Sequence, residues 1–493
     1  MNHSNITKAI FISILALASS QISFAQNPSF EWAKQMGGTG WDQSYSITTD
    51  AVGNVYTTGI FGDTVDFDPG TGITNLISAG VADGFIQKLD ASGNLVWVKQ
   101  MGGNSYDYGK SITTDNNGNV YTTGYFEGTA DFDPGVGTAN LTSAGVGDTY
   151  IQKLEASGNF LWVKQIGGNT LDYGKSITTD NSGNVYSTGI FSSTVDFDPG
   201  TGTLNLSPVG GYDIYIQKLD VSGNLVWVKQ MGGTAYDSGV SITIDSIGNV
   251  YTIGFFKGTA DFDPGVGTIN LTSAGNHDIY IQKLNSSGNL LWVKQMGGTS
   301  DDRGYSITID NNGNIYTTGW FYGTVDFDPG VGNTNLTSAG QEYIFIQKLD
   351  ASGNFLWVKQ MGGIYEDKGS SITTDNSGNV YTSGKFVGTA DFNPGISTAN
   401  LTSVGMSDIF IQKLDSSGNF LWAKQMGGTG YDMGISITTD NSRNIYITGY
   451  FEGTVDFDPG AGTSNLTSAG YQDIFIQKLG QCTPNSGTDI ITA

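Results

Sequence analysis

Paired carboxylates return along this chain at a fixed spacing and could hold a hard cation. The run Asp-Phe-Asp-Pro-Gly begins at Asp66 and recurs every 65 residues, with Asn393 as the one change in it. Two carboxylates at i and i+2 point the same way along an extended segment, and Ca²⁺ prefers several oxygen ligands of this kind. Ca²⁺ is therefore a candidate cofactor. Its candidate ligands are Asp66, Asp68, Asp131, Asp133, Asp196, Asp198, Asp261, Asp263, Asp326, Asp328, Asp456 and Asp458.

A tight turn is the alternative, and favoured, interpretation of the same run. Asp caps a turn through its side chain, Pro presets φ, and Gly takes a positive φ. The spacing of the carboxylates does not match the calcium-binding loop of an EF-hand. The run therefore predicts a turn in every repeat, with calcium binding left open.

A second column of residues could recognise sugars. One loop position per repeat is occupied by Trp41, Tyr106, Leu171, Tyr236, Asp301, Glu366 and Tyr431. A constant aspartate follows it, and three residues later comes a variable column of Tyr45, Lys110, Lys175, Val240, Tyr305, Ser370 and Ile435. Aromatic rings beside fixed carboxylates can stack on sugar rings and accept hydrogen bonds from hydroxyl groups. The alternative is that these are solvated loop residues, with each aspartate turning the chain.

Two tryptophans lie outside the regular tryptophan column described below, and nothing in the repeat gives them a packing role. They are Trp41 and Trp320. The candidate ligand-binding residues are accordingly Trp41, Tyr106, Tyr236, Tyr431 and Trp320.

Catalysis by a nucleophile and a base is disfavoured, and we predict no catalytic residue. Downstream of the leader the chain has a single histidine, His277, in a loop where a surface position is expected, and its one cysteine is Cys482 in the tail. Paired carboxylates could hydrolyse glycosides, which requires two acids flanking the bond. However, near-identical copies argue against a unique catalytic site.

The elements that position these residues follow from the same 65-residue period. Tryptophans recur at Trp32, Trp97, Trp162, Trp227, Trp292, Trp357 and Trp422. Within one repeat, strand-like runs span residues 95–101, 111–114, 120–126 and 150–154, separated by Gly/Asn/Asp/Ser turns. Four antiparallel strands repeated seven times predict an all-β, seven-bladed β-propeller, with each column tryptophan packing between blades.

The two ends of the chain predict how the ring closes. The first repeated strand, residues 30–36, lacks a preceding hairpin partner, and the last, residues 474–479, lacks a following one. The N-terminal strand should therefore complete the last blade. We name the strands of a blade A to D from the axis outward, with 111–114 as A. The A–B and C–D turns are short and constant, whereas the D–A and B–C connections on the other face vary, so the variable face is the better functional candidate.

The repeats resemble a known family. The residues that carry the likeness are Asp-Ala-Ser-Gly-Asn-Leu-Val-Trp at 90–97, Gly118 to Gly124, and Asp131 to Gly135. They are similar to the seven-bladed β-propeller repeats of secreted bacterial proteins, over about residues 30–480. This resemblance implies a fold and an exported setting but no single activity. Many relatives in gliding-type bacteria carry a C-terminal sorting domain, and none is seen before Ala493, so the export route stays open. The hairpin also resembles the tryptophan-docking repeat of quinoproteins.

The predicted organisation has three parts. Lys8, an apolar stretch and Ser-Phe-Ala before Gln26 predict a signal peptide over residues 1–25. The propeller spans residues 26–480, and a C-terminal tail spans 481–493. The protein should be secreted or displayed at the cell surface, with the periplasm as another location.

Charge limits the partners. The net charge of −24 disfavours nucleic acid, because phosphate binding needs a basic surface, and no membrane span is predicted after the leader. We expect a monomeric, non-catalytic binding, adhesion or scaffold protein. Its partner would be a glycan or a protein at the cell surface, met through the variable face. The alternatives are a carbohydrate hydrolase or lyase that uses Asp and Tyr, and a quinoprotein-like oxidoreductase.

Overall fold

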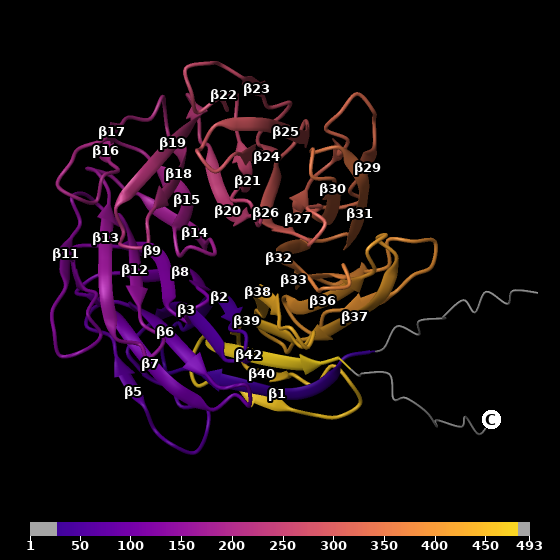
Figure 1. Ribbon diagram of the computed structural model, residues 1–493. Coiled ribbons are helices and arrows are strands. Elements are labelled where there is room, and N and C mark those ends of the chain that lie inside the picture. Colours follow the sequence, from indigo (N-terminus) through magenta and orange to yellow (C-terminus); the bar gives the residue numbers. More distant parts are fainter. Residues whose placement is uncertain (1–26, 482–493) are drawn as a thin grey trace, which may run out of the picture.

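Seven β-sheet blades form a closed ring around a central axis in the computed structural model, which describes residues 27–481 (Figure 1). The predicted signal peptide, and the predicted tail except for Gln481, lie outside the described residues. The described part of the chain holds strands and turns only, so no helix within it could cross a membrane. The expected seven-bladed, all-β architecture is confirmed.

Each blade has two inner strands, A and B, which occupy the same positions in every repeat. The A strands are β2 (Gln43–Thr49), β8 (Asp107–Thr114), β14 (Tyr173–Thr179), β20 (Ser238–Ile244), β26 (Asp302–Ile309), β32 (Lys368–Thr374) and β38 (Met433–Thr439). The B strands are β3 (Val55–Phe61), β9 (Val120–Phe126), β15 (Val185–Phe191), β21 (Val250–Phe256), β27 (Ile315–Phe321), β33 (Val380–Phe386) and β39 (Ile445–Phe451).

The outer strands complete the blades. The C strands are β6 (Asp83–Leu89), β12 (Asp148–Leu154), β18 (Asp213–Leu219), β24 (Asp278–Leu284), β30 (Tyr343–Leu349), β36 (Asp408–Leu414) and β42 (Asp473–Gly480). The D strands are β7 (Leu95–Gly103), β13 (Phe160–Ile166), β19 (Leu225–Gly233), β25 (Leu290–Gly298), β31 (Phe355–Gly363), β37 (Phe420–Met426) and, for the last blade, β1 (Ser29–Met36).

The N-terminal strand closes the ring as expected. β1 pairs antiparallel with β42, from Ser29 opposite Gly480 to Met36 opposite Ile474, and the last sheet runs β1-β42-β39-β38. In Figure 1 the indigo start of the chain lies beside its yellow end. The first and last repeats are therefore one blade.

Closure is reinforced by a ring of identical hydrogen bonds between neighbouring A strands. The hydroxyl of Ser46 accepts from the backbone N–H of Ile112 in the next blade at 3.2 Å. The same bond recurs at every interface, and Ser436 accepts from Ile47 at 3.3 Å where the ring closes. The seven blade interfaces are thus equivalent at the axis.

The B–C connections, expected as long loops, contain small hairpins. They are β4 (Thr64–Asp66) with β5 (Asn75–Ile77), β10 (Thr129–Asp131) with β11 (Asn140–Thr142), β16 (Val195–Asp196) with β17 (Asn205–Leu206), β22 (Thr259–Asp261) with β23 (Asn270–Thr272), β28 (Thr324–Asp326) with β29 (Asn335–Thr337), β34 (Thr389–Asp391) with β35 (Asn400–Thr402), and β40 (Thr454–Asp456) with β41 (Asn465–Thr467). Several extend the preceding blade, as β10 pairs with β7, so some sheets have six strands.

The hydrophobic core lies between blades. One cluster joins Tyr56 and Ile86 of the first blade to Ile112 and Phe126 of the second, and each of the seven interfaces has such a cluster. No blade could bury its apolar face alone, which is why the repeats fold as a ring.

The column tryptophans connect neighbouring blades, in agreement with their predicted role. Trp97 meets Tyr56 of its own blade edge to face, with ring centroids 6.2 Å apart. Its indole N–H donates to the carbonyl of Ala156 in the next blade at 3.2 Å. The tight turn at Gly158, with φ +83°, covers the indole ring, and an added Cβ there would lie 3.1 Å from it. The constant C–D turn is therefore a packing element.

Candidate functional site

A β-bulge in every A strand turns one side chain toward the axis. The pairing between β2 and β3 shifts between Ser44 and Ser46, and the other six A strands shift at the same place. Bulges of this kind re-aim the extra side chain. The bulged residues are Tyr45, Lys110, Lys175, Val240, Tyr305, Ser370 and Ile435. We expected this column in the D–A loops, which was wrong, because the A strands begin several residues earlier than predicted.

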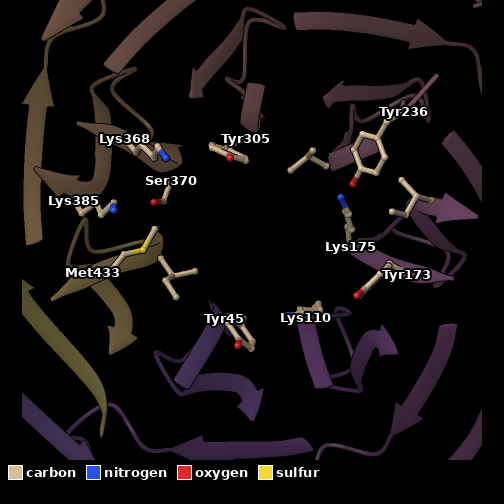
Figure 2. A pocket seen from close by; sticks show the side chains of 13 residues that line it. Tyr45, Lys110, Tyr173, Lys175, Tyr236, Tyr305, Lys368, Ser370, Lys385 and Met433 are labelled. Carbon is tan, nitrogen blue, oxygen red and sulfur yellow. The ribbon is translucent and has the colours of Figure 1, made fainter. Parts of the chain in front are cut away.

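These seven side chains line a cavity of about 710 Å³ on the axis, which we call the axial cavity (Figure 2). Its full lining is Tyr45, Lys110, Tyr173, Lys175, Ile190, Tyr236, Val240, Tyr305, Lys368, Ser370, Lys385, Met433 and Ile435. Four lysines and four tyrosines thus converge on one space in a protein of net charge −24.

Lys110 and Lys175 have no acidic partner in the described part of the chain. The ammonium nitrogen of Lys110 lies 3.7 Å from the centre of the Tyr45 ring and 4.5 Å from that of Tyr108. That of Lys175 donates to the hydroxyl of Ser238 at 2.7 Å. Within residues 27–481, neither lysine forms a salt bridge.

Desolvation perturbs both lysines. Burial in the cavity, with the nearby charge of Lys175 as a second cause, lowers the pKa of Lys110 to about 7. Burial, and then the charge of Arg303, lowers the pKa of Lys175 to about 8. The two ammonium groups are therefore held at an energetic cost that an anion would relieve.

The two lysines across the cavity share one acidic partner. The carboxylate of Glu366 lies 2.6 Å from the ammonium of Lys368 and 3.0 Å from that of Lys385. One carboxylate shared by two ammonium groups leaves one positive charge on that side, and both of these lysines have an acidic partner.

A second hollow opens beside the axial cavity, on the variable face. Its volume is about 700 Å³, and we call it the aromatic groove. It is lined by Thr39, Gly40, Trp41, Gln43, Tyr45, Ile60, Gly62, Asp63, Val81, Ala82, Tyr106, Tyr108 and Tyr471. Trp41, Tyr106 and Tyr471 are 66%, 41% and 67% exposed. Large aromatic side chains with this exposure on a concave surface are typical of a ligand site.

Stacked tyrosines connect the groove to the cavity. The ring of Tyr108 stacks on Tyr106 at 6.2 Å on one side and on Tyr125 at 4.5 Å on the other, and Tyr125 meets Tyr173 at 4.3 Å. Tyr45 lines both hollows. The two hollows therefore form one continuous surface.

Asp63 has an unusual backbone in the groove. Its φ is +55°, and the corresponding positive-φ residues of five other repeats are Gly128, Gly258, Gly323, Gly388 and Gly453. A side chain in this conformation carries strain that glycine avoids. The first repeat thus keeps an exposed carboxylate where most other repeats have none.

The structure separates the five predicted ligand-binding residues. Trp41 and Tyr106 line the aromatic groove, and Tyr236 lines the axial cavity. Tyr431 is 49% exposed but lines neither hollow. Trp320 is only 4% exposed, because its place on β27 turns it into the blade interface behind Arg303 and Lys368, so we remove it from the site.

The constant aspartates are buried, so they are neither solvated nor open to a ligand, but they do turn the chain through their side chains, as the alternative interpretation expected. Asp42 is fully buried and accepts from the N–H groups of Gly38 at 2.7 Å and Gly62 at 3.1 Å. Burial raises the pKa of Asp42 and its equivalents to about 7, and that of Asp237 to about 6. The column fixes the D–A loops.

The Asp-Phe-Asp-Pro-Gly runs form turns with a buried centre. One oxygen of Asp66 accepts from the N–H groups of Asp68 at 3.0 Å and Thr74 at 2.8 Å. The Phe67 ring packs on Phe61 at 5.3 Å, and Gln87 donates to its carbonyl at 2.8 Å. Over residues 27–481, no three metal-ligating side chains gather in one place. Calcium binding by the predicted aspartates stays a prediction.

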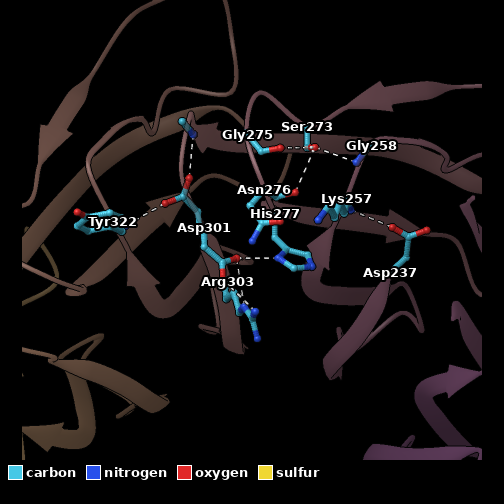
Figure 3. A network of polar contacts seen from close by, with 12 residues as sticks. Asp237, Lys257, Gly258, Ser273, Gly275, Asn276, His277, Asp301, Arg303 and Tyr322 are labelled. Atoms are coloured by element: carbon cyan, nitrogen blue, oxygen red, sulfur yellow. Dashed lines mark hydrogen bonds and ion pairs between the residues drawn. The ribbon is translucent and has the colours of Figure 1, made fainter. Parts of the chain in front are cut away.

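His277 is buried rather than on the surface, which corrects its expected position. It is 8% exposed, and its Nδ1 lies 2.7 Å from a carboxylate oxygen of Asp301, which also binds Arg303 at 2.9 Å (Figure 3). Burial opposes ionisation of Asp301, but the hydrogen bonds from His277 and Arg303 outweigh it and lower its pKa. This network is a charged cross-link between blades.

Sequence reasoning missed two further variable columns near the axis. One starts the A strands and contains Gln43, Tyr108, Tyr173, Ser238, Arg303, Lys368 and Met433. The other lies on the B strands between a constant glycine and a constant phenylalanine, and contains Ile60, Tyr125, Ile190, Phe255, Trp320, Lys385 and Tyr450. Variation between the seven copies, flanked by constant positions, was the signal that could have identified them.

Six segments of the chain match the β-propeller repeat family: residues 31–59, 96–125, 161–197, 291–320, 356–385 and 421–450. The chain is a β-propeller repeat protein. This confirms the family indicated by the sequence, while the secreted and bacterial setting stays a prediction.

Curated relatives are distant. The uncharacterized WD repeat-containing protein L264 of Acanthamoeba polyphaga mimivirus is 24% identical over 85% of this chain and 36% of its own length. Regulatory protein FlaEY of Caulobacter vibrioides is 25% identical over 57% of this chain and 28% of its own length. The chain thus spans about a third of the length of these relatives.

Solved structures are also distant. The WD40 β-propeller domain of Doa1 is 9% identical, with a TM-score of 0.43 over 92% of this chain and 97% of that domain. A protein of unknown function from Bacteroides caccae is 10% identical, with a TM-score of 0.30 over 68% of this chain and 94% of that one.

Proposed function

We propose that this β-propeller binds carbohydrate without chemical turnover, with the aromatic groove as its sugar-binding site. The observation that carries the proposal is the grouping of Trp41, Tyr106 and Tyr471 around one concave surface that also holds the Asp63 carboxylate. The apolar face of a sugar ring can stack on such aromatic side chains. The predicted leader makes an exported or cell-surface location part of the proposal.

Polar groups in the groove are placed to read hydroxyl groups. The amide of Gln43 is held by Gln472 and by the hydroxyl of Tyr45, both at 2.5 Å. Asp63 adds an exposed carboxylate to the lining of the groove. Fixed polar groups keep the ordering cost of binding low.

The groove supports binding better than hydrolysis. Glycosidases of the usual kind place two carboxyl groups on either side of the scissile bond. Among the described residues that line the groove, Asp63 is the one carboxylate. The side chains also differ from blade to blade here, so we propose one asymmetric site.

A glycan array tests the proposal on residues 26–493, once with Ca²⁺ and once with EDTA. Trp41→Ala should lower the affinity for any saccharide that binds by about tenfold or more, as expected for a central aromatic contact. The matched control is Leu171→Ala, the same repeat position in the third blade, which should change nothing. No binding to any saccharide, or equal binding by Trp41→Ala, would contradict the proposal.

A further inference from the structure

We infer that the axial cavity is the acidic subsite of this carbohydrate site. Lys110 and Lys175 would bind the anionic group of an acidic saccharide whose neighbouring ring lies in the aromatic groove. The inference rests on the proposed function and names its ligand class: saccharides that carry a carboxylate or sulfate group.

The geometry allows one ligand to reach both places. Tyr45 lines the groove and the cavity, and the Lys110 ammonium lies 3.7 Å from the centre of its ring. Figure 2 shows Tyr45 and Lys110 at the edge of the cavity. A saccharide in the groove would place its next residue there, past the Tyr45 ring.

The cavity offers charge that nothing in the described chain neutralises. Lys110 is held by tyrosine rings, and Lys175 by the Ser238 hydroxyl, so both keep their full positive charge when protonated. A desolvated charge without a partner is costly, and two like charges in one cavity add to that cost. An anion bound between them would remove both penalties.

Neutral donors complete the subsite. The hydroxyl-bearing side chains of Tyr173, Tyr236, Tyr305 and Ser370 also line the cavity. The Ser370 hydroxyl is buried and has no hydrogen-bond partner among residues 27–481. Hydroxyl donors beside two ammonium groups suit an oxyanion that is attached to a polyhydroxylated ring.

The test compares acidic and neutral saccharides. An array of uronate-bearing, sulfated and neutral saccharides is read with the wild-type protein and with the double variant Lys110→Met/Lys175→Met. The best acidic ligand is then titrated calorimetrically against its neutral counterpart, carboxyl-reduced or desulfated. Comparing the affinities of uronate-bearing and sulfated saccharides identifies which oxyanion the protein prefers.

We expect the wild type to bind the acidic ligand about tenfold or more tightly than its neutral counterpart, as a charge-assisted contact allows. The double variant should lose this preference while keeping its affinity for the neutral ligand. Lys257→Met, which removes a positive charge from an exposed position, is the control for the change in net charge and should keep the preference. Because methionine matches lysine in length and is uncharged, the variants should fold, which thermal unfolding checks.

The two proposals fail in different ways. A wild type that binds neutral ligands as tightly as acidic ones, or a double variant that keeps the preference, overturns the acidic subsite and leaves the sugar-binding groove intact. A wild type that binds no saccharide at all overturns both.

Discussion

Lysine ammonium groups lie over tyrosine rings both at the blade interfaces and at the axial cavity, but the two sets of contacts have different roles. At the interfaces, Lys88 lies over the Tyr56 ring at 5.0 Å and donates to the carbonyl of Ala156, and equivalent lysines lie over tyrosines in the other six blades. At the mouth, Lys110 lies over Tyr45, but only the third blade also has a lysine at that position. The repeated contact holds the ring together, and the unrepeated contact leaves charge free for a ligand.

This contrast indicates which positions of a repeat protein can acquire a function. Constant columns build equal interfaces, since a seven-fold ring tolerates little variation there. The bulge position faces the axial cavity, where side chains differ from copy to copy without altering the repeated blade interfaces. Function is therefore expected at the positions that vary between copies, around the axis and on the variable face.

The largest expected effect distinguishes a column tryptophan at a blade interface from Trp41 in the aromatic groove. Trp227→Ala removes an interface ring and its hydrogen bond to Ser286, and should lower the free energy of unfolding by about 3 kcal/mol, the low end for large-to-small core changes because the ring is only half-buried. Trp41→Ala should leave stability unchanged and weaken saccharide binding. Chemical denaturation of both variants checks this, and equal stability of the two would break the comparison.

The pH dependence of stability tests the role of the constant aspartates, Asp42 and its equivalents. Their folded pKa of about 7, above the ordinary value of 3.8, means that the folded state binds protons more tightly than the unfolded state. Their contribution is complete below about pH 4 and is lost as the pH rises through 7. The lowered pKa values of six lysines act oppositely at higher pH, where these groups lose their protons, whereas the seven aspartates act between about pH 4 and pH 7. The lysines are Lys110, Lys153, Lys175, Lys283, Lys348 and Lys413. The melting temperature should therefore fall by several degrees from pH 5 to pH 8, and a rise would refute this account.

Exchanging counter-charges sharpens the contrast between the two sides of the axial cavity. Ser238→Asp places a carboxylate beside Lys175 and should weaken acidic-saccharide binding about tenfold. Glu366→Gln removes the partner of Lys368 and Lys385 and should strengthen it severalfold. Calorimetric titration at constant ionic strength measures both. Changes in the same direction would show that the cavity charge does not control binding.

The smallest effect concerns one turn. Arg443 takes φ +66° in an A–B turn where the other six repeats have glycine, as in Gly53 with φ +86°. Arg443→Gly should stabilise the protein by roughly 0.5–1 kcal/mol, since glycine avoids the steric cost of this conformation. Arg443→Ala, which keeps the Cβ, should give no gain. Thermal unfolding of the pair decides, and a gain from alanine would point to side-chain charge instead.

The 65-residue period predicted the ring of blades and the packing role of the column tryptophans. The first and last repeated strands, which lack hairpin partners, predicted how the ring closes. The three-residue hairpin strands, such as β10, were missed because so short a run carries no alternation. The axial column was misplaced because a bulge cannot be read from residue types. The burial of His277 depends on Asp301 of the next blade, and Trp320 lies against Lys368 of the next blade, so an averaged repeat hides such pairings.

The most direct test of the central claim is a crystal structure of the protein with its best acidic saccharide. We predict a sugar ring against Trp41 and Tyr106, with its anionic group within hydrogen-bond distance of the ammonium groups of Lys110 and Lys175. A saccharide bound on the constant face, or at the outer rim of the blades, would contradict the account.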